Sequence, residues 1–324
     1  MTTTASNQIT FLDIAKMNGA DPVVGLIDET LSLHPEIQLV PARTIKGLSY
    51  KTIARVGLPT VAFREGNQGT AGSKGRYENR TVGTFLLTPR WSCDKQIADA
   101  HEDGAQALLS IEASGQLESS MVLMARQFYY GADSTLGVTP DALGYPGLMS
   151  LYDATGMTVD AAGTTTSTGS SVWAVKFGSQ NIQWVFGNNG NMTPSDIMIQ
   201  NLYDSNNFAY TGYVQEMAIR PGLQLGSLLG VGRAKNLTAD SGKGLTDSVL
   251  ADLFAKFKAG LVPDAIFMSR RSRTQLQKSR TVVLYGGGEA RGKGNWATVA
   301  PLPTEYGGVP IYATDAILDT ETIV

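Results

Sequence analysis

The sequence predicts an α+β fold whose main elements are one long helix and one long β-hairpin. The helix prediction rests on residues 92–130, which contain no proline and carry apolar residues at helical spacing. The hairpin prediction rests on two strand-like runs, one on each side of the glycine-rich segment 66–75. Alternating apolar and polar residues between 172 and 219 predict further strands.

The first element along the chain is a polar arm, predicted over residues 1–44. Its apolar residues stand at a spacing typical of short helices, and Gly19 and Pro35 interrupt them. Such short helices bury little surface by themselves. The first residues, MTTTASNQIT, lack the basic and apolar stretches of a signal peptide. No apolar run approaches the ~18 residues of a membrane span, so we expect a soluble cytoplasmic product with no membrane partner.

The predicted hairpin occupies residues 45–90, with its strands inside Ile45–Leu87. A two-stranded ribbon is only marginally stable alone in water, so a long hairpin needs support, and a neighbouring subunit can provide it. Its basic residues form either a solvated face or ion pairs between subunits. The candidates for contacts between subunits are Arg55, Arg64, Lys74, Arg76 and Arg80.

The long helix is predicted over residues 92–130. Ser92 or Asp94 can cap its start, and Gly131 stands where a C-terminal glycine belongs. Gly104 and Gly115 each weaken a helix by about 1 kcal/mol, which predicts a bend. A helix of this length in a chain without heptad repeats indicates a spine rather than one member of a bundle.

The rest of the chain predicts short strands and two further helices. The predicted strands are 172–177, 182–186, 212–219, 265–268 and 307–317. The predicted helices are 246–259, which ends before the stop signals Gly260 and Pro263, and the basic run 270–280.

The composition gives little support to catalytic chemistry. The chain has two histidines, His34 and His101, and a single cysteine, Cys93, so metal sites and catalytic triads have few possible members. A buried thiol is the favoured interpretation of Cys93 over a thiol activated by Lys95. Charged residues make up only 17% of the chain, which favours a surface partly covered by other subunits. The net charge of −3 argues against a strongly basic nucleic-acid binder.

One segment, Gly287–Gly294, matches most of a phosphate-binding loop. The match lacks the hydroxyl residue that would bind magnesium, because Gly294 takes its place. Residues 295–299 read as extended, whereas such a loop needs a following helix. A flexible basic loop is therefore favoured, and a phosphate-binding enzyme remains the alternative from another functional class.

In their order, these elements resemble the major capsid proteins of tailed bacteriophages with the Hong Kong 97-like capsid fold. The resemblance is carried by the polar arm, the hairpin with its glycine-rich tip and the long helix. Three short motifs add to it: Gly144-Tyr-Pro-Gly-Leu148, Pro263-Asp-Ala-Ile-Phe-Met-Ser269 and Tyr306-Gly-Gly-Val-Pro-Ile311. The resemblance spans nearly the whole chain.

The resemblance implies a protein that is not an enzyme, needs no cofactor and self-assembles into an icosahedral shell of hexamers and pentamers. It implies an arm at 1–44, a hairpin called the E-loop at 45–90, a peripheral domain at 91–235 with the long helix as its spine, and an axial domain at 236–324. The arm and E-loop are expected to reach over adjacent subunits.

The implied partners are a separate scaffolding protein, a portal protein, a decoration protein and packaged DNA. The basic residues at the start of the second helix are either a solvated face or weak, sequence-independent DNA contacts: Arg270, Arg271 and Arg273. We expect assembly in the host cytoplasm and a place in the virion capsid. The alternative is an encapsulin-like nanocompartment shell, which encloses a cargo enzyme instead of DNA.

Overall fold

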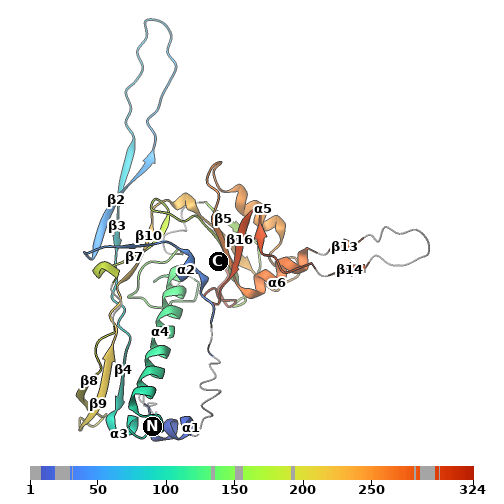
Figure 1. Cartoon of the computed structure of the whole chain (residues 1–324). Helices are drawn as coiled ribbons and strands as arrows, with labels where there is room; N and C mark the ends of the chain where they lie inside the picture. Colours follow the sequence, from blue (N-terminus) through green and yellow to red (C-terminus); the bar gives the residue numbers. More distant parts are fainter. Residues whose placement is uncertain are drawn as a thin grey trace.

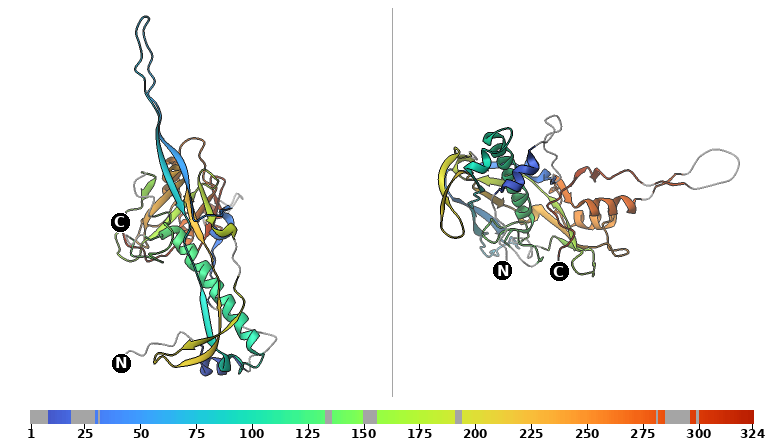
Figure 2. Two further views of the ribbon diagram at one scale, coloured as in Figure 1. Left: turned by 90° about the vertical axis from the view of Figure 1, so that its left-hand side faces the viewer. Right: turned by 90° about the horizontal axis from the view of Figure 1, so that it is seen from below.

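The computed structural model describes residues 9–18, 30, 32–132, 136–149, 156–190, 194–280, 282–284, 296–298, 300 and 301–324. A mixed body of helices and sheets carries two antiparallel hairpins that project from it in different directions (Figures 1 and 2). The longer hairpin pairs β2 (Ser49–Gly57) with β3 (Arg76–Gly83), from Ser49 opposite Gly83 to Gly57 opposite Arg76. The shorter one pairs β13 (Val282–Leu284) with β14 (Trp296–Thr298).

The long helix is α4 (Ala105–Tyr130), which runs from one end of the body to its centre (Figure 1). Its predicted start at residue 92 is wrong. Residues 90–94 form strand β4, in which Trp91 and Cys93 alternate inward with period two. One helical turn, α3 (Lys95–Ala98), follows and is capped by the Asp94 side chain.

The predicted interruption by glycine is confirmed at one of its two positions. Gly104 is the N-cap of α4 with φ +83°, a conformation that favours glycine, and it separates α3 from α4. Gly115 lies inside the continuous helix. The predicted end is also confirmed, because Gly131 is the C-cap with φ +63°.

Three sheets, as far as the described residues show, organise the body besides the two hairpins. The first has the order β4-β9-β8, the second β1-β7-β10, and the third, here called the large sheet, β15-β16-β12-β6-β11-β5. Their further strands are β1 (Ala42–Thr44), β5 (Thr158–Asp160), β6 (Ser170–Val175), β7 (Ile182–Phe186), β8 (Met198–Tyr203), β9 (Ala209–Glu216), β10 (Pro221–Leu225), β11 (Val231–Leu237), β12 (Ala265–Met268), β15 (Glu305–Tyr306) and β16 (Val309–Ala313).

The shorter helices complete these layers. The helices α5 (Asp247–Ala255) and α6 (Arg270–Ser279) supply Leu250, Leu253 and Leu276 to a core on one face of the large sheet. The predicted helix 246–259 is thus shorter at its C-terminal end, while its cap, Thr246, accepts a hydrogen bond from Val249 N.

The other face of the large sheet packs on the end of α4 through aromatic residues. The ring centroid of Tyr129 lies 6.3 Å from that of Trp173 in β6 and 6.2 Å from that of Phe267 in β12. Trp184 of β7, in the second sheet, also contacts this helix, because its ring centroid lies 5.2 Å from that of Phe128. These aromatic residues and Tyr130 all belong to one buried core.

Several helices and strands of the described residues lie within or across the predicted bounds of the arm and of the axial domain. In the predicted arm 1–44, the helices α1 (Phe11–Met17) and α2 (Pro35–Leu39) bury Ile14 and Glu36 against the same subunit, and β1 pairs with β7. The predicted boundary between 235 and 236 falls inside β11. It cuts the large sheet, which takes strands from both sides of it.

Candidate subunit-interaction surfaces

The long hairpin projects from the body (Figure 1), and it exposes apolar side chains that its own subunit leaves uncovered. Its base is anchored, because the Arg80 guanidinium donates to Gly226 O at 2.5 Å and the Tyr50 hydroxyl donates to the Gln224 side chain. Further out, Ile53, Val61 and Phe63 are 75%, 89% and 108% exposed. Exposed apolar residues gathered on one element are typical of a surface that binds another protein.

The outer end of the hairpin is ordered by its own hydrogen bonds. Arg64 Nη1 donates to Gln68 O at 2.8 Å across the end turn, in which Asn67 has φ +63°. The Ser73 hydroxyl joins the two sides by donating to Thr60 O at 2.7 Å. We call residues 58–75 the tip. The tip has a defined local structure although no core supports it.

The five predicted contact residues are all found on the hairpin, and four of them have partners there or at its base. Arg64 and Arg80 make the hydrogen bonds described above, the Arg76 and Glu78 side chains lie 3.3 Å apart, and the Arg55 guanidinium lies 5.5 Å from the Tyr77 ring centroid. Lys74 makes no ion pair with any described residue. Arg55, Arg64, Lys74 and Arg76 are exposed, whereas Arg80 is half-buried and therefore anchors the hairpin.

Charge is divided unevenly between the hairpin and the body. Residues 45–87 contain seven lysines and arginines against two glutamates. Residues 91–219 contain three basic against thirteen acidic residues, and we call them the acidic region. Opposite charges on two surfaces steer them together and set their orientation. The hairpin and the acidic region therefore carry net charges of opposite sign.

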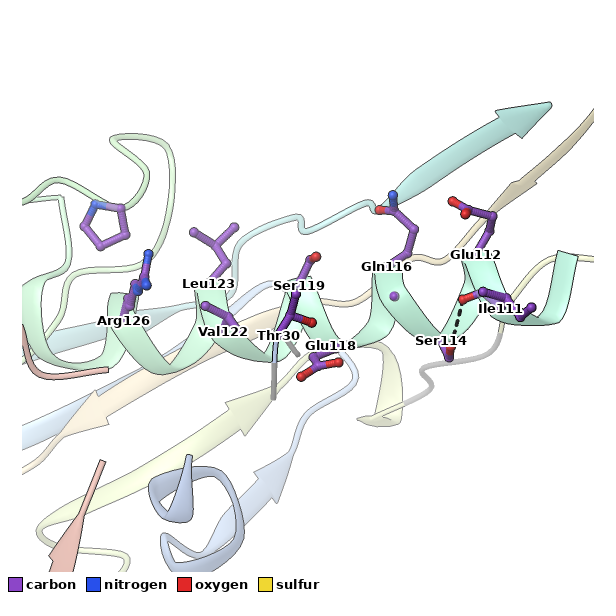
Figure 3. A pocket seen from close by; sticks show the side chains of 12 residues that line it. Thr30, Ile111, Glu112, Ser114, Gln116, Glu118, Ser119, Val122, Leu123 and Arg126 are labelled. Atoms are coloured by element: carbon purple, nitrogen blue, oxygen red, sulfur yellow. Dashed lines mark hydrogen bonds between the residues drawn. The ribbon is translucent and has the colours of Figure 1, made fainter. Parts of the chain in front are cut away.

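A groove along α4 gathers part of this acidic charge (Figure 3). It measures about 570 Å³, and Glu112 and Glu118 line it together with Arg126 further along the helix. Burial raises the pKa of Glu112, and the charge of Asp13 raises it further. The positive charge of a basic side chain from another subunit would act against both effects, because it favours the ionised carboxylate.

The predicted DNA-facing arginines on α6 have different surroundings. Arg271 donates to Thr168 O at 2.7 Å and to Leu237 O at 3.1 Å, and Arg273 donates to Pro303 O at 2.8 Å. These two residues therefore hold loops of their own subunit together. Arg270 is exposed beside an open groove at the start of α6.

The residues considered above for catalytic or metal chemistry are buried or bonded within their own subunit. His34 and Glu36 are both buried, with Nδ1 and Oε1 3.6 Å apart, and His101 Nδ1 accepts from Asp103 N at 3.1 Å. Cys93 is fully buried, and burial, with the charges of Asp94 and Glu112, raises its pKa to about 11. The described residues include no group of three potential metal ligands. The segment 287–294 lies outside them.

Residues 19–324 match the model of the family described as Major capsid protein GP7. The chain belongs to this family. The major capsid function predicted from the sequence is thereby confirmed, and the capsid protein is a component of a bacteriophage shell and of its virion. No curated protein sequence matches the chain.

A solved phage structure shares the fold of the capsid protein. A chain of the bacteriophage epsilon15 structure aligns with a TM-score of 0.71 and 20% identity, over 100% of this chain and 99% of that one. The predicted Hong Kong 97-like capsid fold is confirmed. The capsid of phage XM1 has a TM-score of 0.46 and 10% identity, over 69% of this chain and 98% of that one. The SrpI encapsulin of Synechococcus elongatus has a TM-score of 0.45 and 8% identity, over 70% and 95%.

Two features had no signal in the sequence. One is the buried network around Glu321, whose members Tyr130, Ser171 and Arg233 are far apart along the chain. The other is an apolar pocket beside the base of the hairpin. In addition, no helix among the described residues has the length and apolarity needed to cross a membrane.

Proposed function

We propose that the capsid protein forms hexamers and pentamers in which the hairpin acts as an E-loop, lying on the acidic region of the neighbouring copy. The observation that carries this proposal is the hairpin itself, which is exposed, partly apolar and basic, and extends from a body whose acidic region has the opposite charge. Contacts of ordinary size, repeated around a closed shell, stabilise it through multivalency.

The proposed domains follow the sheets. The peripheral domain holds α4 and the sheet β4-β9-β8, and the axial domain holds the large sheet with α5 and α6. The helices α1 and α2 of the arm pack on their own subunit, so the proposed contacts of the arm with adjacent subunits involve only its exposed residues.

The shell is proposed to enclose DNA. Arg270 is exposed and is therefore the arginine proposed to make weak contacts with the DNA phosphates. Scaffolding, portal and decoration proteins are the proposed partners, and the host cytoplasm is the proposed place of assembly. Membership of the major capsid family favours this assignment over a compartment that encloses a cargo enzyme.

Deleting Gln68–Gly72 tests the role of the hairpin. We expect an unchanged circular dichroism spectrum and thermal unfolding of the subunit, because these residues are exposed and contribute little buried area. Particle formation should fail or give fragile particles, because the lost contact recurs at every copy. Light scattering and negative-stain microscopy, with scaffolding protein added where assembly needs it, measure the outcome.

A variant with a five-residue glycine and serine segment in place of Gln68–Gly72 is the matched control, since it restores loop length without the native side chains. The proposal would be overturned if the deletion unfolded the subunit while assembled particles remained sound. It would also be overturned if the native chain stayed a stable monomer across concentration, ionic strength and added scaffold.

We also propose that the protein is not an enzyme and that Gly287–Gly294 binds no nucleotide. Lys293→Ala should leave particle yield within about twofold of the native protein, and isothermal calorimetry with ATP and magnesium should give no heat of binding. Micromolar affinity for ATP that disappears in Lys293→Ala would instead support the phosphate-binding alternative.

A further inference from the structure

An apolar pocket lies beside the base of the hairpin, where the segment after β3 passes the C-terminal half of α4. Its main lining residues are Phe85, Leu87, Leu123, Met124, Tyr145 and Pro221. Its volume is about 130 Å³. An apolar protein cavity of ~150 Å³ can hold one benzene molecule. The pocket therefore has the size of a single aromatic side chain.

The open side of this pocket carries two exposed leucines. Leu86 and Leu143 both line it, and they are 73% and 86% exposed. They come from separate segments of the chain, so their meeting here is a product of the fold. Apolar side chains around the opening of an apolar pocket are typical of a protein-binding surface. A lone subunit leaves this surface uncovered.

Phe63 on the hairpin tip has the properties of the missing occupant. Its side chain is 108% exposed, the highest value among the large apolar residues of the described ranges. Arg64, which follows it, has a matching charge in Asp141 at the pocket. Aromatic and arginine side chains are the residue types that most often anchor protein interfaces.

The occupant must come from a second copy of the chain. The outer end of the hairpin points away from the body (Figures 1 and 2). A subunit therefore does not bring its own tip, which carries Phe63, to its own pocket. A contact between the tip of one copy and the pocket of the next is heterologous, because it joins two different surfaces. Each copy contacts one neighbour through its tip and another neighbour through its pocket. Contacts of this kind close into rings when the rotation between copies closes.

We propose that Phe63 of one copy inserts into this pocket of the next copy, with Arg64 near Asp141. The inference rests on the proposed role of the hairpin and adds to it a specific anchor and receiving site.

Two cysteines introduced on the two sides of the contact test it directly. In Phe63→Cys with Leu143→Cys, particles assembled at a raised subunit concentration, which offsets the loss of the aromatic ring, should give disulfide-linked dimers and higher multimers on a non-reducing gel under mild oxidation. The native Cys93 contributes little background because it is fully buried. The matched control is Phe208→Cys with Leu143→Cys, since Phe208 is also strongly exposed, at 71%. It should stay monomeric on the gel.

Assembly of single variants gives a second measure that does not depend on cross-linking. Phe63→Ala should raise the subunit concentration needed for assembly at least about tenfold, because truncating an interface anchor generally has an effect of this size or larger. Phe208→Ala should change it less than about twofold.

The outcomes separate this inference from the proposed function. If deletion of Gln68–Gly72 prevents assembly while Phe63→Ala assembles like the native chain and the cysteine pair forms no cross-link, the hairpin role stands and the pocket assignment is wrong. If neither the deletion nor Phe63→Ala alters assembly, both proposals fail.

Discussion

Replacing Glu321 with alanine is expected to lower the free energy of unfolding of the subunit by about 3–5 kcal/mol, because it leaves a buried cation without its carboxylate. Glu321 and Arg233 are 2% and 1% exposed, and Oε2 of Glu321 lies 3.6 Å from Nη2 of Arg233. The Tyr130 hydroxyl donates to Oε1 at 2.7 Å, and the Ser171 hydroxyl donates to Oε2 at 2.5 Å. One side chain thus joins the end of α4 to the strands β6 and β11.

Urea unfolding of the unassembled subunit measures this loss, and a double variant controls for it. Arg233→Met with Glu321→Leu removes both charges together, so it should lose less stability than Glu321→Ala alone. Burial raises the pKa of Glu321, against the opposing effects of Arg233, Ser171 and Tyr130. Because this pKa is higher in the folded subunit than in the unfolded chain, the folded state holds the proton more tightly. The difference in stability between the native chain and Glu321→Ala should therefore grow as the pH falls through the raised pKa. Equal stability of Glu321→Ala and the native chain at pH 8 would show that the pair contributes nothing.

The sequence predicted best those elements whose signal is local. The bounds of β7 and β12 are as predicted, because each is a short apolar run with turn residues at its ends. The hairpin was also predictable, since its glycine-rich tip separates two strand-like runs. The start of α4 was not, because the period-two pattern at Trp91 and Cys93 spans only one strand and adjoins a helical pattern without proline.

Features that depend on distant parts of the chain had no local signal. The large sheet takes β6 from the middle of the chain and β16 from near its end, so no composition shift marks a boundary at residue 235. The apolar pocket has the same origin, because Phe85, Leu123 and Tyr145 meet only through packing. The predicted contact residues were identified by charge alone, which is why Arg80 was grouped with exposed residues although it anchors the base of the hairpin.

The motif Gly144-Tyr-Pro-Gly-Leu148, which carried part of the resemblance, has a physical role at the end of α4. Leu148 N and Met149 N donate to Phe128 O and Tyr129 O at 2.8 and 2.9 Å. The motif thereby satisfies carbonyls that the end of a helix leaves without partners. The backbone of Gly147 packs directly against the C-terminal end of α4. A Cβ atom added at Gly147 would lie 2.4 Å from Gln127 O and 2.4 Å from Gly131 N.

Replacing Gly147 with alanine is therefore expected to destabilise the subunit by about 3 kcal/mol. Both overlapping atoms belong to the backbone, so relief of the overlap must move the segment away from α4 and weaken its capping hydrogen bonds. The matched control is Gly115→Ala inside α4, where an added Cβ would meet nothing within 4 Å. This change should stabilise the subunit by about 0.5–1 kcal/mol, because alanine favours the helix over glycine. Urea unfolding of the two variants should give shifts of opposite sign. Equal tolerance of both would mean that the motif does not cap the helix at the distances described.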